Sequence, residues 1–201
     1  FAAKAKVLYP RIDFAFSIFK EIFTSSKLDD EKRLGEILAE NKSRARMRLE
    51  NASHSAAVAR ATSYFSPTSS YNDLTGGIGY FHFLEKICRD YENPKNRGPL
   101  MQKLKDVCSR LFTLDHMLVS YTADEEGFAL LAGAMKKLTD ALKNSDGKRY
   151  PFVFSAQNQN EGFKTSSQVN YVARCGNFRK GGFAYTGTLR ILKMILNYDY
   201  L

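Results

Sequence analysis

The sequence predicts a helix-rich α/β protein, layered as an α+β sandwich, and three observations lead to that prediction. In the first half of the chain, apolar residues recur every three or four positions, which is the spacing of one buried helix face. In the second half, short strand-like stretches alternate with helical patterns. A hydrophobic content of 44% over 201 residues supplies enough apolar side chains for one large core or two modest ones.

The N-terminal elements follow from local patterns. Residues 1–8 alternate small or apolar residues with lysine, which predicts a half-buried strand. Pro10 is expected to open a helix, because proline suits the first helical turn. Either Asp29 or Asp30 is expected to cap a second, long helix that bends near residues 51–53. The apolar face of the first helix carries Phe14, Ile18, Ile22 and Phe23.

The middle of the chain combines small residues with turn signals. Alanine and serine dominate residues 52–61, which predicts close packing of another element against this stretch. Residues 66–70, Ser-Pro-Thr-Ser-Ser, are expected to form a loop. A further apolar segment, residues 74–91, carries Gly-Gly-Ile-Gly near its start.

A break at residues 92–99 predicts a domain boundary, because two prolines and a glycine stand among polar residues there. We therefore divide the chain into residues 1–92, a linker 93–98, and residues 99–201. Beyond the break, the pattern predicts alternating helices and strands. These are a helix 99–112, a strand 117–122, a helix 127–143, a strand 168–174 and a helix 188–198.

The net charge of +9 raises the question of nucleic-acid binding. The excess is spread evenly, with +4 in residues 1–100 and +5 in residues 101–201. The densest cluster spaces its side chains two residues apart, which places them on two opposing helix faces. This spacing favours solvated helix surfaces over a phosphate-binding stripe, so a nucleic-acid-binding domain is the weaker alternative. The cluster is Lys42, Arg44, Arg46 and Arg48.

The chain lacks a complete catalytic or metal motif. His82 and Glu85 approach the inverted His-x-x-Glu-His zinc pattern, but Lys86 stands where the second histidine belongs. His54 and His116 have no partners at ligand spacing. We therefore predict no catalytic and no metal-binding residue within the chain, and we expect His82 to be a surface or core-edge side chain.

Two glycine-rich stretches were considered as phosphate sites. Residues 76–79 lack the Lys-Ser/Thr pair of a P-loop, and no strand precedes them. Residues 176–182 form a basic turn, interpreted as a loop between a strand and a helix, with an anion-binding loop as the alternative.

The remaining composition bears on the compartment. The three cysteines lack CxxC spacing, which predicts free buried thiols in a reducing environment. Apolar runs are too short to span a bilayer, so no membrane contact is expected. The cysteines are Cys88, Cys108 and Cys175.

Several stretches together carry a resemblance to a known family. The strongest are residues 161–173, residues 182–187 and the final Asp-Tyr-Leu of residues 199–201; weaker ones are residues 32–34, 40–43, 54–56 and 60–61. They resemble the C-terminal half of insulinase-type (pitrilysin-like) zinc metallopeptidases, in the presequence-protease branch.

The resemblance implies a clamshell of two halves, each with two homologous α/β domains, around a chamber that cuts unfolded peptides. Residues 1–92 would be the later part of the third domain, and residues 99–201 the earlier part of the fourth. The zinc helix would lie elsewhere in the parent protein, and the family's substrate-binding Arg and Tyr would fall after Leu201. Substrate-contacting residues inside the chain are unknown.

The expected function is that of a noncatalytic segment of a zinc metalloendopeptidase, lining its substrate chamber and inactive by itself. Expected partners are the rest of the parent protease, unfolded peptides and a second copy of a truncated piece, with no nucleic acid. The expected compartment is a bacterial cytoplasm, or an organelle matrix in a eukaryote. A metal-free scaffold or binding module of the same fold is the alternative from another class.

Overall fold

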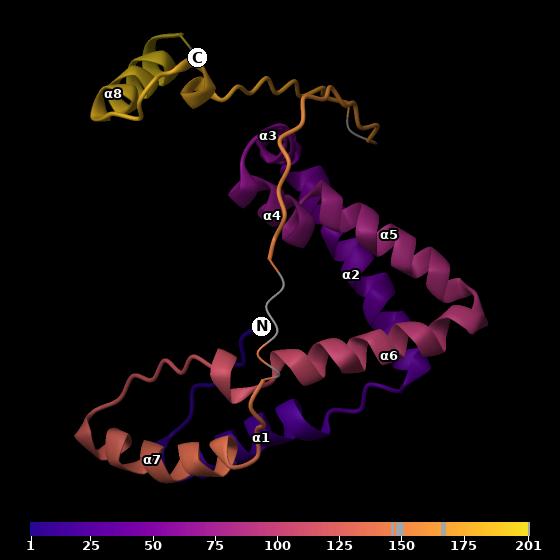
Figure 1. Ribbon diagram of the computed structural model, residues 1–201, viewed down its shortest axis with the longest axis vertical. Coiled ribbons are helices and arrows are strands. Elements are labelled where there is room, and N and C mark those ends of the chain that lie inside the picture. The colour runs from indigo at the N-terminus through magenta and orange to yellow at the C-terminus, as the bar shows by residue number, and fades with distance from the viewer. Residues whose placement is uncertain (146, 148–150, 166–167, 201) are drawn as a thin grey trace. The chain divides into compact units, whose positions relative to one another are not determined.

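The computed structural model describes residues 1–145, 147, 151–165 and 168–200, and within them the structure is built of helices (Figure 1). Short 3₁₀ turns occur at Tyr9–Arg11, Leu114–His116 and Phe178–Gly181, and a π-helical turn follows α8 at Leu196–Tyr200. The α-helices are α1 Ile12–Ser25, α2 Glu31–Asn51, α3 Ser53–Ser63, α4 Pro67–Gly76, α5 Ile78–Glu92, α6 Pro94–Leu111, α7 Glu125–Thr139 and α8 Gly187–Ile195.

The helix-rich character of the predicted fold class is confirmed, but the three predicted strands are absent from the described residues. Residues 1–8, 117–122 and 168–174 form neither strand nor helix there. The backbone is extended at Leu8 and Met117, yet a strand also requires a neighbour to complete its hydrogen-bond ladder. The alternating patterns therefore did not identify strands in the described residues. Within the described part, the strand-like pairing is one parallel bridge between Thr113 and Lys143.

Pairwise proximity divides the chain into two compact units. The first unit comprises residues 1–40 and 86–152, and the second comprises residues 41–85 and 153–201. Both units combine segments from either side of the predicted linker. The predicted domain boundaries concern a larger protein and stay a prediction.

The core of the first unit lies between α1 and α7. Ile12 and Phe16 on α1 meet Ala134 and Leu138 on α7. Ala134 is fully buried, and its short side chain allows the two helices to approach closely. Partly buried apolar side chains surround this cluster, namely Tyr9, Phe19, Phe23, Met117, Tyr121, Leu131, Met135 and Leu142. The helix predicted after Pro10 thus packs against a helix more than 100 residues later in the chain, but the predicted face was wrong in part, because Phe14 is 61% exposed and Ile18 is 38% exposed.

Two predicted helix boundaries are confirmed. The Asp30 carboxylate accepts a 2.8 Å hydrogen bond from the Arg33 N–H at the start of α2, which is how a capping residue satisfies a free helical donor. The predicted bend is a helix break at Ala52, whose backbone leaves the helical region between α2 and α3. The first unit also anchors α5 on α2, since the Tyr91 hydroxyl donates to the Glu31 carbonyl oxygen at 2.8 Å.

A predicted loop and a predicted linker are helical instead. Residues 66–70 were expected to form a loop, but Ser66 caps α4, with Pro67 in its first turn. The predicted linker 93–98 is helical from Pro94 onward, and the Asn93 side chain accepts from the Lys95 N–H at 3.1 Å. In both cases the proline follows a capping residue and occupies a position that needs no N–H donor.

No helix in the part of the chain that the structure describes is both long and apolar enough to cross a lipid bilayer.

Candidate functional site

A cluster of charged side chains in the second unit is centred on Arg60 of α3. The guanidinium donates from Nη1 to Asp73 Oδ2 of α4 at 2.6 Å. Its other side faces Glu161, with Nε donating to Oε2 at 2.7 Å and Nη2 to Oε1 at 3.0 Å. Arg60 therefore binds one carboxylate through a two-point fork and a second through its remaining edge.

Asp73 is the buried member of this cluster. The residue is 3% exposed, and its Oδ2 also accepts from the Gly79 N–H at 3.2 Å. Its Oδ1 has no hydrogen-bond partner among the described residues. A buried carboxylate depends strongly on its counter-charge, so Arg60 compensates most of the cost of burying Asp73.

The glycines after α4 make room for this carboxylate. A Cβ atom at Gly77 would lie 2.5 Å from Asp73 Oδ1, and one at Gly79 would lie 2.6 Å from Oδ2. The Gly-Gly-Ile-Gly stretch therefore allows the backbone to close over an aspartate.

Aromatic groups line the cluster on two sides. The Arg60 guanidinium carbon lies 5.2 Å from the centre of the Tyr64 ring, within the range of a cation–π contact. The His82 ring of α5 lies 6.0 Å from the ring of Phe163, two residues beyond Glu161. Burial raises the pKa of the Tyr64 hydroxyl above its ordinary value, and the neighbouring Glu161 carboxylate raises it further.

The charges of the cluster stabilise one another. The hydrogen bond from Arg60 lowers the pKa of Glu161 to about 2, and Tyr64 and His82 act in the same direction. Glu161 and then Asp73 raise the pKa of Arg60 above its already high ordinary value. Arg60 and Glu161 thus stay ionised at neutral pH. The hydrogen bonds of the cluster hold α3, α4 and residues 153–165 together.

Comparisons with known proteins point to one family. Residues 1–87 match the family model described as Peptidase M-16C associated. The protein HypA of Clostridium perfringens (strain 13 / Type A) is 30% identical over 196 residues, covering 98% of this chain and 20% of HypA. These findings support a C-terminal segment of an insulinase-type peptidase.

A plant relative extends the match. Presequence protease 1, chloroplastic/mitochondrial, of Arabidopsis thaliana is 22% identical over 203 residues, covering 98% of this chain and 18% of that protein. The chain thus spans about a fifth of the length of these relatives.

His54 and His82 belong to no cluster of metal ligands among the described residues. His82 is exposed and packs beside Phe163, while Glu85 is also exposed on α5. The exposed His54 ring lies 5.8 Å from the ring of Tyr171, and His116 belongs to the 3₁₀ turn before residues 117–122. Across the described residues, no three His, Cys, Asp or Glu side chains gather closely enough to hold a metal ion.

The basic loop 176–182 is a short 3₁₀ turn with a defined cap. The Asn177 side chain accepts from the Arg179 N–H at 3.1 Å, and Gly182 ends the turn at φ +83°, a conformation that favours glycine. The three cysteines were predicted to be buried, but Cys88, Cys108 and Cys175 are half-buried, and the Cys88 thiol donates to the Leu38 carbonyl oxygen at 3.6 Å.

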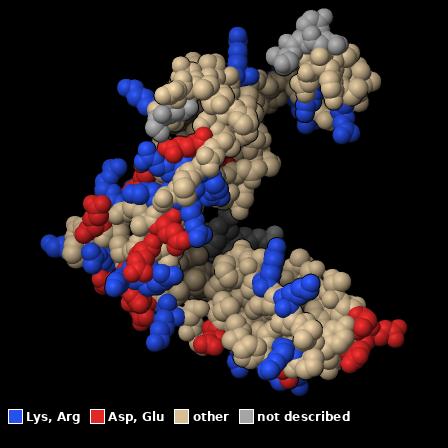
Figure 2. All heavy atoms as spheres, turned by 180° about the vertical axis from the view of Figure 1, so that it is seen from behind, with Lys and Arg blue, Asp and Glu red and all other residues tan. Residues whose placement is uncertain are grey.

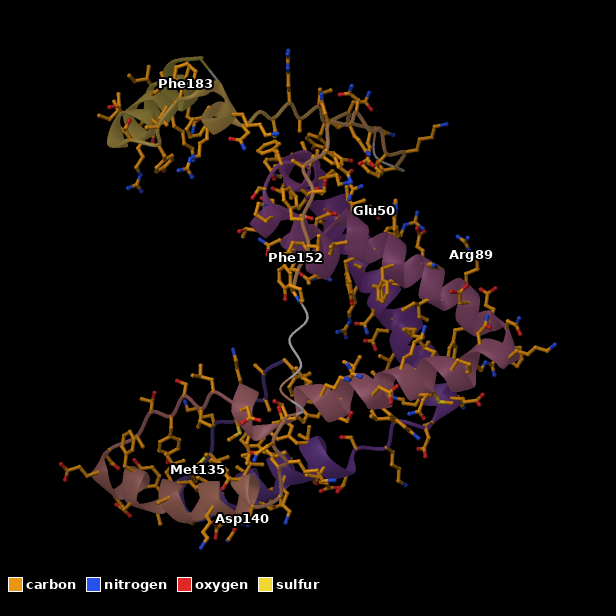
Figure 3. The ribbon with its side chains drawn as sticks, in the orientation of Figure 1. Glu50, Arg89, Met135, Asp140, Phe152 and Phe183 are labelled. Carbon is orange, nitrogen blue, oxygen red and sulfur yellow. The ribbon has the colours of Figure 1, made fainter. Side chains whose placement is uncertain are left out.

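Basic side chains on α2 lie beside acidic ones. Arg46 donates to Glu50, which is labelled in Figure 3, at 2.9 Å across one helical turn. Ala45, between the basic positions, is buried. On the face shown in Figure 2, Asp and Glu side chains are interspersed among the Lys and Arg side chains.

The sequence did not predict the Arg60 cluster. Arg60 and Glu161 are 101 residues apart, and no local pattern marks either residue. For Asp73 the sequence does hold a signal, because Gly77 and Gly79, which make room for its carboxylate, follow it closely.

Proposed function

We propose that this segment is a noncatalytic part of a zinc-dependent peptidase and forms part of the wall of a chamber that holds unfolded peptides. The observation that carries the proposal is the match across 98% of the chain to a relative named as a presequence protease. The helical scaffolding built by the described residues supports this role, because a wall needs packed helices and no catalytic group.

Zinc would be held by residues outside this chain. The ion would activate a water molecule for attack on the peptide bond, with a glutamate as base. Within the chain, Lys86 occupies the second histidine position of the nearest zinc-like pattern, and its cation opposes metal binding. The chain's own contribution would be to confine and orient the peptide.

The partners would be the rest of a longer polypeptide and its peptide substrates. The C-terminal helix α8 presents a largely exposed apolar surface, in which Ile191 is 62% exposed and Met194 is 63% exposed. Phe183, labelled beside α8 in Figure 3, adds a ring that is 68% exposed. Exposed apolar surface of this kind is typical of an interface, and another part of the parent protein would cover it. A second copy of this chain would be the alternative partner for that surface, and nucleic acid and membrane are not proposed as partners. The compartment would be a bacterial cytoplasm or an organelle matrix.

The test is elemental analysis of the purified 201-residue chain together with a peptide-cleavage assay. We expect less than stoichiometric zinc and no cleavage of an unfolded peptide. One zinc ion per chain, or zinc-dependent cleavage, would overturn the proposal. The sequence upstream of this segment in its parent separates a zinc peptidase from a metal-free scaffold of the same fold, since only the former carries His-x-x-Glu-His.

A further inference from the structure

Residues 153–165, here called the strap, run without helix or strand through the second unit. Most strap residues are exposed, and Val153 is 84% exposed. Little apolar burial therefore holds the strap in place, in contrast to the packed pair of helices α3 and α4.

Polar contacts attach the strap to α3 and the residue that follows it. The Gln157 N–H donates to the Tyr64 carbonyl oxygen at 2.7 Å. Four residues later, the Glu161 carboxylate accepts two hydrogen bonds from the Arg60 guanidinium. The edge contact of Phe163 with His82 adds a third attachment, on α5.

The two carboxylates on Arg60 differ in their surroundings. Asp73 is buried on α4 and stays with the helix pair, whereas the Glu161 side chain is 28% exposed and belongs to the strap. If the strap detaches, Arg60 keeps its hydrogen bond to Asp73, so the buried ion pair between α3 and α4 remains. The cluster can therefore lose Glu161 while the contact between α3 and α4 stays intact.

We propose that the strap opens and closes over α3 as a unit. The ion pair between Glu161 of the strap and Arg60 of α3 holds the closed state. Closure places the strap over Arg60 of α3 and over Tyr64, the residue that follows this helix. Opening exposes a guanidinium edge with two free donors beside an aromatic ring. This inference rests on the geometry of the second unit and does not depend on the proposed peptidase role.

The test is amide hydrogen exchange on the whole chain, comparing Glu161→Gln with the unmodified protein. The substitution keeps the shape of the side chain and removes its charge. We expect the Gln157 amide to exchange roughly tenfold faster, which corresponds to about 1.4 kcal/mol. Amides in α3 and α4 should keep their exchange rates. Trypsin should also cleave after Lys164 faster in this variant.

The matched control is Glu50→Gln, which removes the same charge from an exposed pair with Arg46 in the second unit. It should leave the exchange of Gln157 unchanged. The proposal fails if Glu161→Gln leaves the exchange of Gln157 unchanged, or if this amide is unprotected in the unmodified protein. It also fails if the amides of α3 and α4 speed up as much as that of Gln157, because the contact then stabilises the unit as a whole.

Discussion

Replacing Arg60 with methionine should destabilise the α3–α4 pair far more than the loss of a surface charge would. Asp73 is 3% exposed, and its Oδ1 already lacks a hydrogen-bond partner among the described residues. Without Arg60, the carboxylate stays buried with only the Gly79 N–H to stabilise its charge. Removing one partner of a buried ion pair costs about 3–5 kcal/mol. We therefore expect Arg60→Met to lower the opening free energy of α3 and α4 by about that amount.

Hydrogen exchange measures this effect in the second unit without requiring the whole chain to unfold in one step. The matched control is Arg46→Met, because Arg46 is 65% exposed and pairs with Glu50 on the surface of α2. That substitution should cost only about 0.3–0.5 kcal/mol. Adding Asp73→Asn to Arg60→Met should recover part of the loss, because the amide carries no charge. The reasoning is refuted if the two single methionine variants cost the same, or if the added asparagine makes the loss larger.

Three further predictions concern the core, the glycine turn and the acid range. Leu138→Ala should destabilise the first unit by about 2–5 kcal/mol, because the side chain is 3% exposed between α1 and α7. The opening free energy of α1, measured by amide hydrogen exchange, reports this effect, and a decrease under about 0.5 kcal/mol would contradict the described core. Gly77→Ala should destabilise α4 by about 1–3 kcal/mol, because the new Cβ would meet Asp73 Oδ1 at 2.5 Å; an unchanged thermal midpoint by circular dichroism would count against that contact. Because the pKa of Glu161 is lowered from 4.5 to about 2, its stabilising contribution should be fully present above pH 4.5 and be lost as the pH falls toward 2. Carboxyl-carbon NMR reports this titration directly, and a midpoint near 4.5 in the unmodified protein would exclude the fork to Arg60.

Helices were the part of the fold that the sequence predicted well. Apolar spacing located α1, α2 and α7, because a helix that buries one face must repeat its apolar residues at the helical period. Asp29 or Asp30 was predicted as a cap because a short acidic side chain before an apolar pattern satisfies free N–H groups, and the structure shows that Asp30 is the cap. These signals are local, so a single sequence contains them.

Two prolines in a predicted loop and a predicted linker stand at the starts of helices. Pro67 lies in the predicted loop and Pro94 in the predicted linker, although each stands in the first turn of a helix after a capping residue. The Ser66 and Asn93 side chains were the signals that distinguish a helix start from a break.

Strands and the charged cluster depend on distant residues. An alternating pattern such as residues 117–122 describes a strand only when a second strand lies beside it, and the pattern does not name that partner. Likewise, Arg60 and Glu161 meet only because the chain returns to α3 after 101 residues. Local periodicity carries no information about such a return.

The most direct test of the central claim is photo-crosslinking in the full-length polypeptide that contains this segment. An unfolded peptide carrying a photoreactive group would be bound with zinc removed, and the crosslinked residues would be mapped by mass spectrometry. We expect crosslinks within residues 1–201, and we expect that restoring zinc leads to peptide cleavage without any ligand to the metal in this range. The account is contradicted if the bound peptide is cleaved on adding zinc while none of its crosslinks fall within the segment.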